Sequence, residues 1–196
     1  MSKLWAVSWI TSIVASTVLS QAAETQTPSR VLMRTDLGDI ILEVYPERAP
    51  ITVANFLRYV DEGRLDSASF YRAVTLNNQP NDSVRIQVIQ GGLRGHRDMV
   101  LPPIELETTD VTGMAHLDGT LSMARAAVGT ASSEFFICIG AQPELDYGGK
   151  RNADGQGFAA FGRVVEGMEV VRAIQSGALQ GQMLQEPVRI VSVSRL

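Results

Sequence analysis

Short apolar runs recur along the chain from Arg30 onward, and glycine, proline, aspartate and asparagine separate them. The runs are rich in valine, isoleucine and phenylalanine, which pack well on strands. Short strands with turn residues between them are typical of an all-β barrel or sandwich. We predict eight strands, at Val31 to Thr35, Asp39 to Tyr45, Ser69 to Val74, Val84 to Gln90, Thr120 to Arg125, Glu134 to Ile139, Phe158 to Val165 and Val188 to Leu196.

Two further segments have helical periodicity. The first follows Pro50 and stops at Gly63, and its apolar positions recur three and four residues apart, at Val53, Phe56, Leu57 and Val60. The second stops at Gly177 and carries a similar stripe at Met168, Val171 and Ile174. We expect each helix to pack its stripe on the core and to cover an open end of the β structure.

The first 22 residues differ from the rest of the chain. Lys3 precedes an apolar run from Leu4 to Leu19 that only serine and threonine interrupt, and Ser20-Gln21-Ala22 follows. This order is typical of a secretory signal peptide, so we expect cleavage after Ala22 and export to the periplasm or the medium. The alternative is an uncleaved signal anchor, although the run is short for a transmembrane helix. Residues 23–29 then form a flexible lead-in, and residues 30–196 form one domain.

Charge and cysteine content exclude several classes of protein. The full chain has a formal net charge of −4, and loss of Lys3 with the leader makes it −5. Mild acidity without a basic run argues against a nucleic-acid partner. Cys138 is the only cysteine and stands in an apolar stretch, so we expect a buried, unreactive thiol. Too few metal ligands cluster to predict a metal site, and no Ser-His-Asp arrangement is readable.

Four segments carry recognisable motifs. In order they are TDLGDIILEVYPERAPITVANF; SFYRAV with VIQGG; GTLSMARAAVGTASSEFFICIG; and ELDYGG with FAAFGRVVEGMEVV. Together they resemble the cyclophilin family of peptidyl-prolyl cis/trans isomerases over about residues 31 to 195. The Met-Ala-Arg form of the third segment is similar to that of bacterial envelope cyclophilins.

The resemblance implies a fold, an activity and a set of site residues. The implied fold is a mainly β, closed eight-stranded antiparallel barrel capped by two helices. The implied activity needs no cofactor and acts on proline-containing unfolded or partly folded polypeptides, and we expect a monomer without a membrane span in the mature chain. The implied catalytic residues are Arg72 and Gln90, and the implied substrate contacts are Val88, Ala124, Arg125, Phe136, Leu145, Phe158, Gln87 and Glu134.

The chemistry explains the need for an arginine beside an apolar pocket. Rotation about an X-Pro bond must overcome a barrier of about 18–20 kcal/mol, because the amide is stabilised by resonance. A guanidinium that binds the carbonyl before proline, and approaches the proline nitrogen as it pyramidalises, stabilises the twisted amide more than either planar form. An apolar pocket grips the pyrrolidine ring meanwhile.

Several positions depart from the family pattern. Glu134 stands where glutamine is usual, Glu144 where an aromatic is usual and Gln87 where phenylalanine is usual, and about ten extra residues follow Arg72, in loop 75–86. We expect Glu134 to pair with Arg72 or Arg125 and to compete with substrate. These departures leave open a non-catalytic chaperone or proline-peptide binding module in the cell envelope. A third alternative, a structural envelope protein with no function in the groove, has only the signal peptide in its favour.

Overall fold

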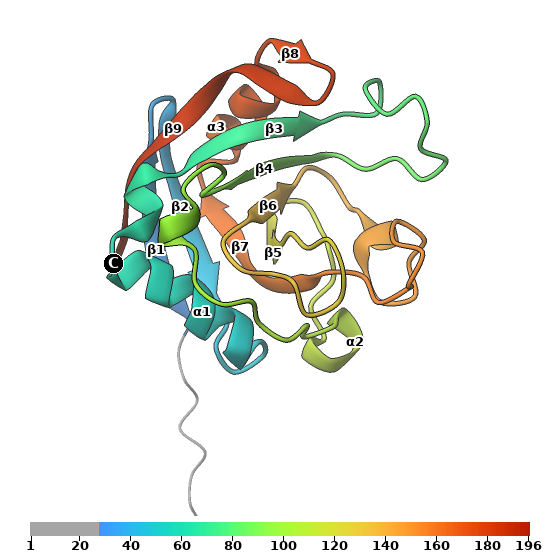
Figure 1. Ribbon diagram of the computed structural model, residues 1–196, viewed down its shortest axis with the longest axis horizontal. Coiled ribbons are helices and arrows are strands. Elements are labelled where there is room, and N and C mark those ends of the chain that lie inside the picture. The colour runs from blue at the N-terminus through green and yellow to red at the C-terminus, as the bar shows by residue number, and fades with distance from the viewer. Residues whose placement is uncertain (1–27) are drawn as a thin grey trace, which may run out of the picture.

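The computed structural model describes residues 28–196 (Figure 1). The predicted signal peptide and most of the predicted lead-in lie outside the described residues. Ser29, which we assigned to the lead-in, already belongs to the first strand. Within residues 28–196, no helix is long and apolar enough to cross a membrane.

Nine strands and three α-helices follow one another along the described chain. The strands are β1 (Ser29–Thr35), β2 (Gly38–Val44), β3 (Ser69–Val74), β4 (Val88–Gly92), β5 (Thr120–Met123), β6 (Phe135–Cys138), β7 (Ala159–Glu166), β8 (Leu179–Gln180) and β9 (Met183–Arg195). The helices are α1 (Pro50–Asp61), α2 (Thr109–Thr112) and α3 (Met168–Gln175), and short 3-10 turns lie at Arg64–Ser67 (η1), Arg97–Met99 (η2) and Pro143–Leu145 (η3).

Eight of the strands close into a barrel, as predicted. The strand order is β1-β2-β7-β5-β6-β4-β3-β9, and pairing of β1 with β9 completes the ring. Neighbouring strands are antiparallel throughout. The two-residue β8 pairs only with the first part of β9 and forms a hairpin at the barrel edge.

Two strands begin at other residues than predicted, and two short elements were not predicted. The strand predicted from Val84 begins only at Val88, and the last strand begins at Met183, five residues before the predicted Val188. Helix α2 has four residues and β8 has two, and neither length shows a helical or alternating pattern.

Helices α1 and α3 cover opposite ends of the barrel (Figure 1). Helix α1 lies beside the end of β9, where Asp61 pairs with Arg195. Helix α3 packs on the β1–β2 turn, so closely that a Cβ on Gly38 would lie 2.9 Å from Val170 Cγ2. The predicted helical stripes face the core, with the exception that Met168 is only partly buried.

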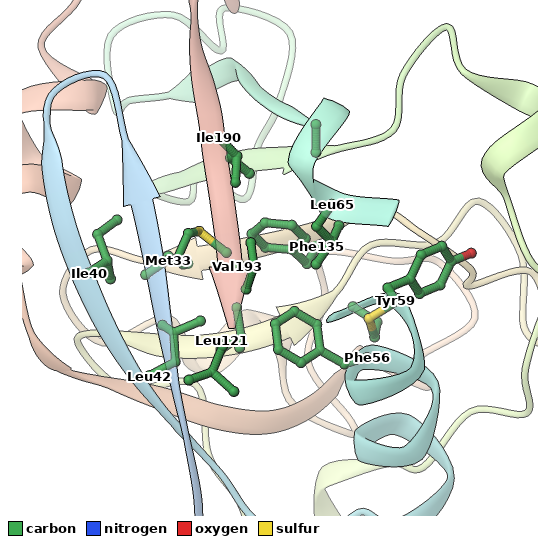
Figure 2. Close-up of a cluster of buried hydrophobic side chains, with 14 of the residues drawn as sticks. Met33, Ile40, Leu42, Phe56, Tyr59, Leu65, Leu121, Phe135, Ile190 and Val193 are labelled. Carbon is green, nitrogen blue, oxygen red and sulfur yellow. The ribbon is translucent and has the colours of Figure 1, made fainter. Parts of the chain in front are cut away.

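The barrel interior is filled by inward side chains from the strands and from α1. Figure 2 shows Phe56 of α1 among Leu121, Phe135 and Val193. The Phe56 ring centroid lies 6.1 Å from that of Phe135, close to perpendicular, and 5.2 Å from that of Phe161. Offset and edge-on contacts of this kind are the favourable arrangements of aromatic rings.

A second apolar cluster lies on the outer face of the barrel. Because side chains alternate along a strand, Phe135 and Ile137 of β6 face the interior while Phe136 and Cys138 face outward. The outer cluster consists of Val74, Ile86, Val88, Phe136, Cys138 and Leu145, with Ala124 and Phe158 packed against it. Burial raises the pKa of the Cys138 thiol, which agrees with the predicted unreactive cysteine.

Candidate active site

A groove of about 470 Å³ opens over this outer cluster. The outer faces of β3, β4 and β6 form its floor, and the segments before β4, after β5 and before β7 form its walls. All predicted site residues except Gln87 line the groove: Arg72, Val88, Gln90, Ala124, Arg125, Glu134, Phe136, Leu145 and Phe158.

Gln87 does not reach the groove with the other predicted residues, and Ile86 lines it instead. The backbone N–H of Gln87 donates to Gln142 Oε1 at 3.2 Å, and its carbonyl accepts from the N–H of Ile139 at 2.9 Å. Alternation along the chain places Ile86, Val88 and Gln90 on one face and Gln87 on the other. Contrary to the prediction, Gln87 therefore does not line the groove, and Ile86 takes its place there.

Hydrogen bonds from two sides hold the Arg72 guanidinium. Nη1 donates to Gln90 Oε1 at 2.7 Å, and Nε donates to Gln182 Oε1 at 3.0 Å, an oxygen that Nη2 also contacts. An arginine has five N–H donors. One N–H on each of Nη1 and Nη2 thus has no partner among the described residues, and these two donors are available to a ligand.

The sequence does not indicate that Gln182 belongs to the site. It lies 110 residues from Arg72 in the chain, in the turn between β8 and β9. No motif marks this turn, and the contact exists only because β3 and β9 are neighbours in the barrel. Burial and the charge of Arg151 lower the pKa of Arg72, which nevertheless stays protonated at neutral pH because a guanidinium is so strongly basic.

Glu134 is bound by Tyr71 rather than by an arginine. The Tyr71 hydroxyl donates to Glu134 Oε2 and accepts a hydrogen bond from Gln90 Nε2 at 2.7 Å. Ser133 Oγ donates to the other carboxylate oxygen at 3.2 Å. In the described part of the chain Glu134 makes no ion pair with Arg72 or Arg125, so the expected competition with substrate is not found. Burial and the neighbouring carboxylate raise the pKa of Tyr71, which keeps its proton for this bond.

Arg125 orders one wall of the groove. Its Nη1 and Nη2 each donate to a carboxylate oxygen of Asp154 at 2.8 Å, and Nε donates to the carbonyl of Gly157 at 2.8 Å. The guanidinium lies over the Phe158 ring, 5.3 Å from its centroid. The hydrogen bonds from Arg125 lower the pKa of Asp154 to about 2. The side chain of Arg125 therefore holds Phe158 and the preceding loop in place.

An apolar pocket lies beside Arg72 in the same groove. Its walls include Val88, Phe136 and Leu145, which are 3%, 4% and 1% exposed, so they are fixed by packing. Phe158 meets Phe136 edge-on, with centroids 5.3 Å apart. A pocket of this composition suits a pyrrolidine ring, which is apolar and has no N–H donor.

Beneath the pocket lies a Ser-His-Asp arrangement that was not readable in the sequence. His116 Nδ1 lies 2.7 Å from Asp146 Oδ1, and Nε2 lies 2.9 Å from Ser122 Oγ. His116 is 1% exposed and Ser122 is 0% exposed, so no substrate carbonyl reaches the hydroxyl. The His116 ring stacks on Phe136 at 5.8 Å, so the trio supports the pocket and does not constitute a hydrolytic site.

Comparison with known proteins agrees with this geometry. Residues 30–195 match the model of the family described as cyclophilin type peptidyl-prolyl cis-trans isomerase/CLD. The chain is 32% identical over 166 residues to peptidyl-prolyl cis-trans isomerase A of Dickeya dadantii, covering 84% of this chain and 80% of that one. It is 31% identical over 149 residues to peptidyl-prolyl cis-trans isomerase B of Escherichia coli, covering 76% and 85%.

A solved structure shows the same fold. The crystal structure of a cyclophilin type peptidyl-prolyl cis-trans isomerase from Cryptosporidium parvum superposes with a TM-score of 0.69 at 18% identity, covering 87% of this chain and 98% of that one. The family match spans nearly the whole described chain, and the barrel, the groove and its arginine lie within it. The chain therefore belongs to the cyclophilin-type peptidyl-prolyl cis-trans isomerases.

Proposed function

We propose that the groove around Arg72 rotates X-Pro bonds in exported polypeptides and so assists their folding. The observation that carries the proposal is the position of Arg72. Two of its N–H groups have no partner in residues 28–196, and the side chain lies beside the apolar pocket. Family membership supports the reaction, and the predicted leader supports the choice of exported substrates.

Each part of the groove has a task in this reaction. Val88, Phe136 and Leu145 hold the pyrrolidine ring by burying it. The free donors of Arg72 bind the carbonyl of the residue before proline and face the proline nitrogen as its lone pair localises. Gln90 and Gln182 keep the guanidinium in place, so little reorganisation accompanies the twist. No covalent bond forms or breaks.

The test is the cis/trans exchange rate of a blocked Ala-Pro peptide, measured by exchange NMR with the purified protein. We expect exchange to accelerate in proportion to protein concentration, far above the uncatalysed time of tens to hundreds of seconds. Binding of the peptide without acceleration would support the rival chaperone function and overturn this proposal.

A further inference from the structure

Two loops meet at one rim of the groove, and buried hydrogen bonds hold the first of them. Gln79, in loop 75–86, is 1% exposed, and its Nε2 donates to the carbonyls of Thr75 at 2.7 Å and Ile86 at 2.8 Å. The N–H of Ile86 returns a bond to Gln79 Oε1 at 3.2 Å. These hydrogen bonds fix the inserted loop as one wall of the groove.

Arg151, in the loop before β7, is held against this wall. Its Nη1 donates to the Val84 carbonyl at 2.7 Å and to Gln79 Oε1 at 3.3 Å, and it lies 3.1 Å from Asp82 Oδ2. These contacts all use one nitrogen. Nε and Nη2 of Arg151 therefore have no partner in residues 28–196, and the side chain, 16% exposed, lines the groove.

The lining of the groove is more basic than the protein as a whole. Arg72, Arg125 and Arg151 all line it, and among the described lining residues Glu134 is the only acidic side chain. Asp154 offsets the charge of Arg125 and Asp82 offsets part of that of Arg151, whereas Arg72 has no carboxylate partner in the described chain. Because the whole chain has a net charge of −4, this positive lining is a local feature of the groove.

Asn152, next to Arg151, supplies a second unused donor. Its side chain lines the groove, and its Nδ2 is shielded from solvent without a hydrogen-bond partner among the described residues. Buried amide nitrogens in folded proteins are nearly always bonded. Rotation of the Asn152 amide toward the groove would bring this donor to an acceptor bound beside Arg151.

We propose that Arg151 and Asn152 form an anion-binding subsite that selects substrates with aspartate or glutamate next to the isomerised X-Pro bond. The Nε and Nη2 edge of an arginine matches the two oxygens of a carboxylate, and the asparagine amide adds a third donor. The inserted loop holds Arg151 in place, and Asp82 partly offsets its charge. The subsite deepens the proposed isomerase function and rests on it.

The experiment compares blocked peptides that differ only in glutamate or glutamine, placed before the proline in one pair and after it in another. We expect kcat/KM for the glutamate peptide to exceed that for its glutamine partner by about 5-fold at one of the two positions in low salt. The ratio falls with added salt, which screens an ion pair. Titration with the preferred glutamate peptide, but not its glutamine partner, shifts the Asn152 side-chain amide resonances.

Four variants separate the subsite from general electrostatics. Arg151→Gln brings the ratio near 1 while leaving the glutamine peptides active, and Asp82→Asn raises the ratio because a competing anion is lost. Asn152→Asp, which is nearly isosteric, also lowers the ratio, and it provides a second test of the subsite if Arg151→Gln disturbs the loop. Arg172→Gln removes an equal charge outside the groove, from an exposed pair with Asp118, and leaves the ratio unchanged.

Two outcomes would overturn the inference at different levels. A wild-type ratio near 1 at both positions, or a ratio that survives both Arg151→Gln and Asn152→Asp, removes the subsite but leaves the isomerase intact. No acceleration of any peptide removes the proposed function together with the subsite.

Discussion

At the scale of single residues, the proposed function predicts that the charge of Arg72 acts on the rotating amide and contributes little to the fold. A hydrogen bond to a charged donor is worth about 1.5–3 kcal/mol, so Arg72→Ala lowers kcat/KM by about 10- to 100-fold. Arg72→Lys recovers little, since an ammonium lacks the planar fork that addresses carbonyl and nitrogen together. Activity and thermal unfolding are measured on the same preparations. A folded Arg72→Ala protein with unchanged activity contradicts the mechanism.

Gln182 acts at the same scale but through Arg72. Its Oε1 accepts from both Nε and Nη2 of Arg72, so Gln182→Ala lets the guanidinium move. We expect kcat to fall by about 3- to 10-fold with KM little changed, because positioning is lost while the apolar pocket is kept. Steady-state kinetics check this. Gln185→Ala, an exposed change three residues away on β9, is the matched control, and a rise in KM alone would contradict a positioning role.

At the scale of elements, the departure from the family pattern at Glu134 has a partner on another strand. Tyr71 on β3 and Glu134, just before β6, bond to each other across β4, and Gln90 on β4 joins them to Arg72. The hydrogen bond from the tyrosine hydroxyl holds the Glu134 carboxylate, which would otherwise be free to turn toward Arg72. The bond from Tyr71 thus compensates for the carboxylate at position 134 and keeps the guanidinium available.

This coupling predicts a non-additive pair of variants. Tyr71→Phe removes the donor to Glu134 Oε2 and lowers kcat/KM by about 5- to 10-fold, as the carboxylate turns to Arg72. Glu134→Gln alone changes activity by less than about 3-fold, and Tyr71→Phe with Glu134→Gln regains most of the loss because the new amide is neutral. The three kcat/KM values form the test. Additive losses would show that Glu134 and Tyr71 act independently.

A second cross-strand contact stabilises the barrel at some distance from the groove. Glu43 on β2 accepts from Arg163 of β7 at 2.9 Å and from Arg30 of β1 at 3.0 Å, and its side chain is 11% exposed. The hydrogen bond from Arg163 has the largest effect on the pKa of Glu43. Together with the bonds from Arg30 and Tyr45, it lowers that pKa below 4.5 despite burial.

Glu43 therefore contributes stability that depends on pH. A carboxylate with a lowered folded pKa stabilises the protein above its unfolded pKa, and this contribution is lost as the pH falls through the folded pKa. Both arginines are more than half exposed, so we expect Glu43→Gln to cost about 1 kcal/mol, or about 3 °C in Tm, at pH 7. The difference shrinks below about pH 4. Thermal unfolding across pH checks this, with Asp36→Asn, from an exposed pair, as a control that moves Tm little.

At the scale of the whole molecule, the domain and its leader make separate predictions. The barrel accounts for residues 29–195, and the proposed export depends on residues 1–22. We expect protein from its native host to have the intact mass of residues 23–196 and to occur outside the cytoplasm. Mass spectrometry of fractionated cells decides this. A membrane-bound form that retains Trp5 and Trp9 would instead identify a signal anchor.

Local pattern alone predicted much of this protein. Strand alternation and helical spacing located the barrel strands and both end-capping helices, because each pattern states which face of an element is buried. The order of four motifs then indicated the family and, through it, Arg72, Gln90 and the pocket. Each of these residues lies within a short sequence motif, so its neighbours in the chain are enough to identify it as a site residue.

Only the tertiary structure decided which residues meet. Gln182 accepts a hydrogen bond from Arg72, Tyr71 donates one to Glu134, and Arg151 donates one to loop 75–86. These contacts form because the fold brings together segments that are far apart in the chain. The strand register decides that Ile86, and not Gln87, faces the groove. A shift of one residue would exchange the faces of the two side chains. Sequence periodicity states that a side chain faces outward, but which partner it finds there depends on the strand order and on the loops that fold over the groove.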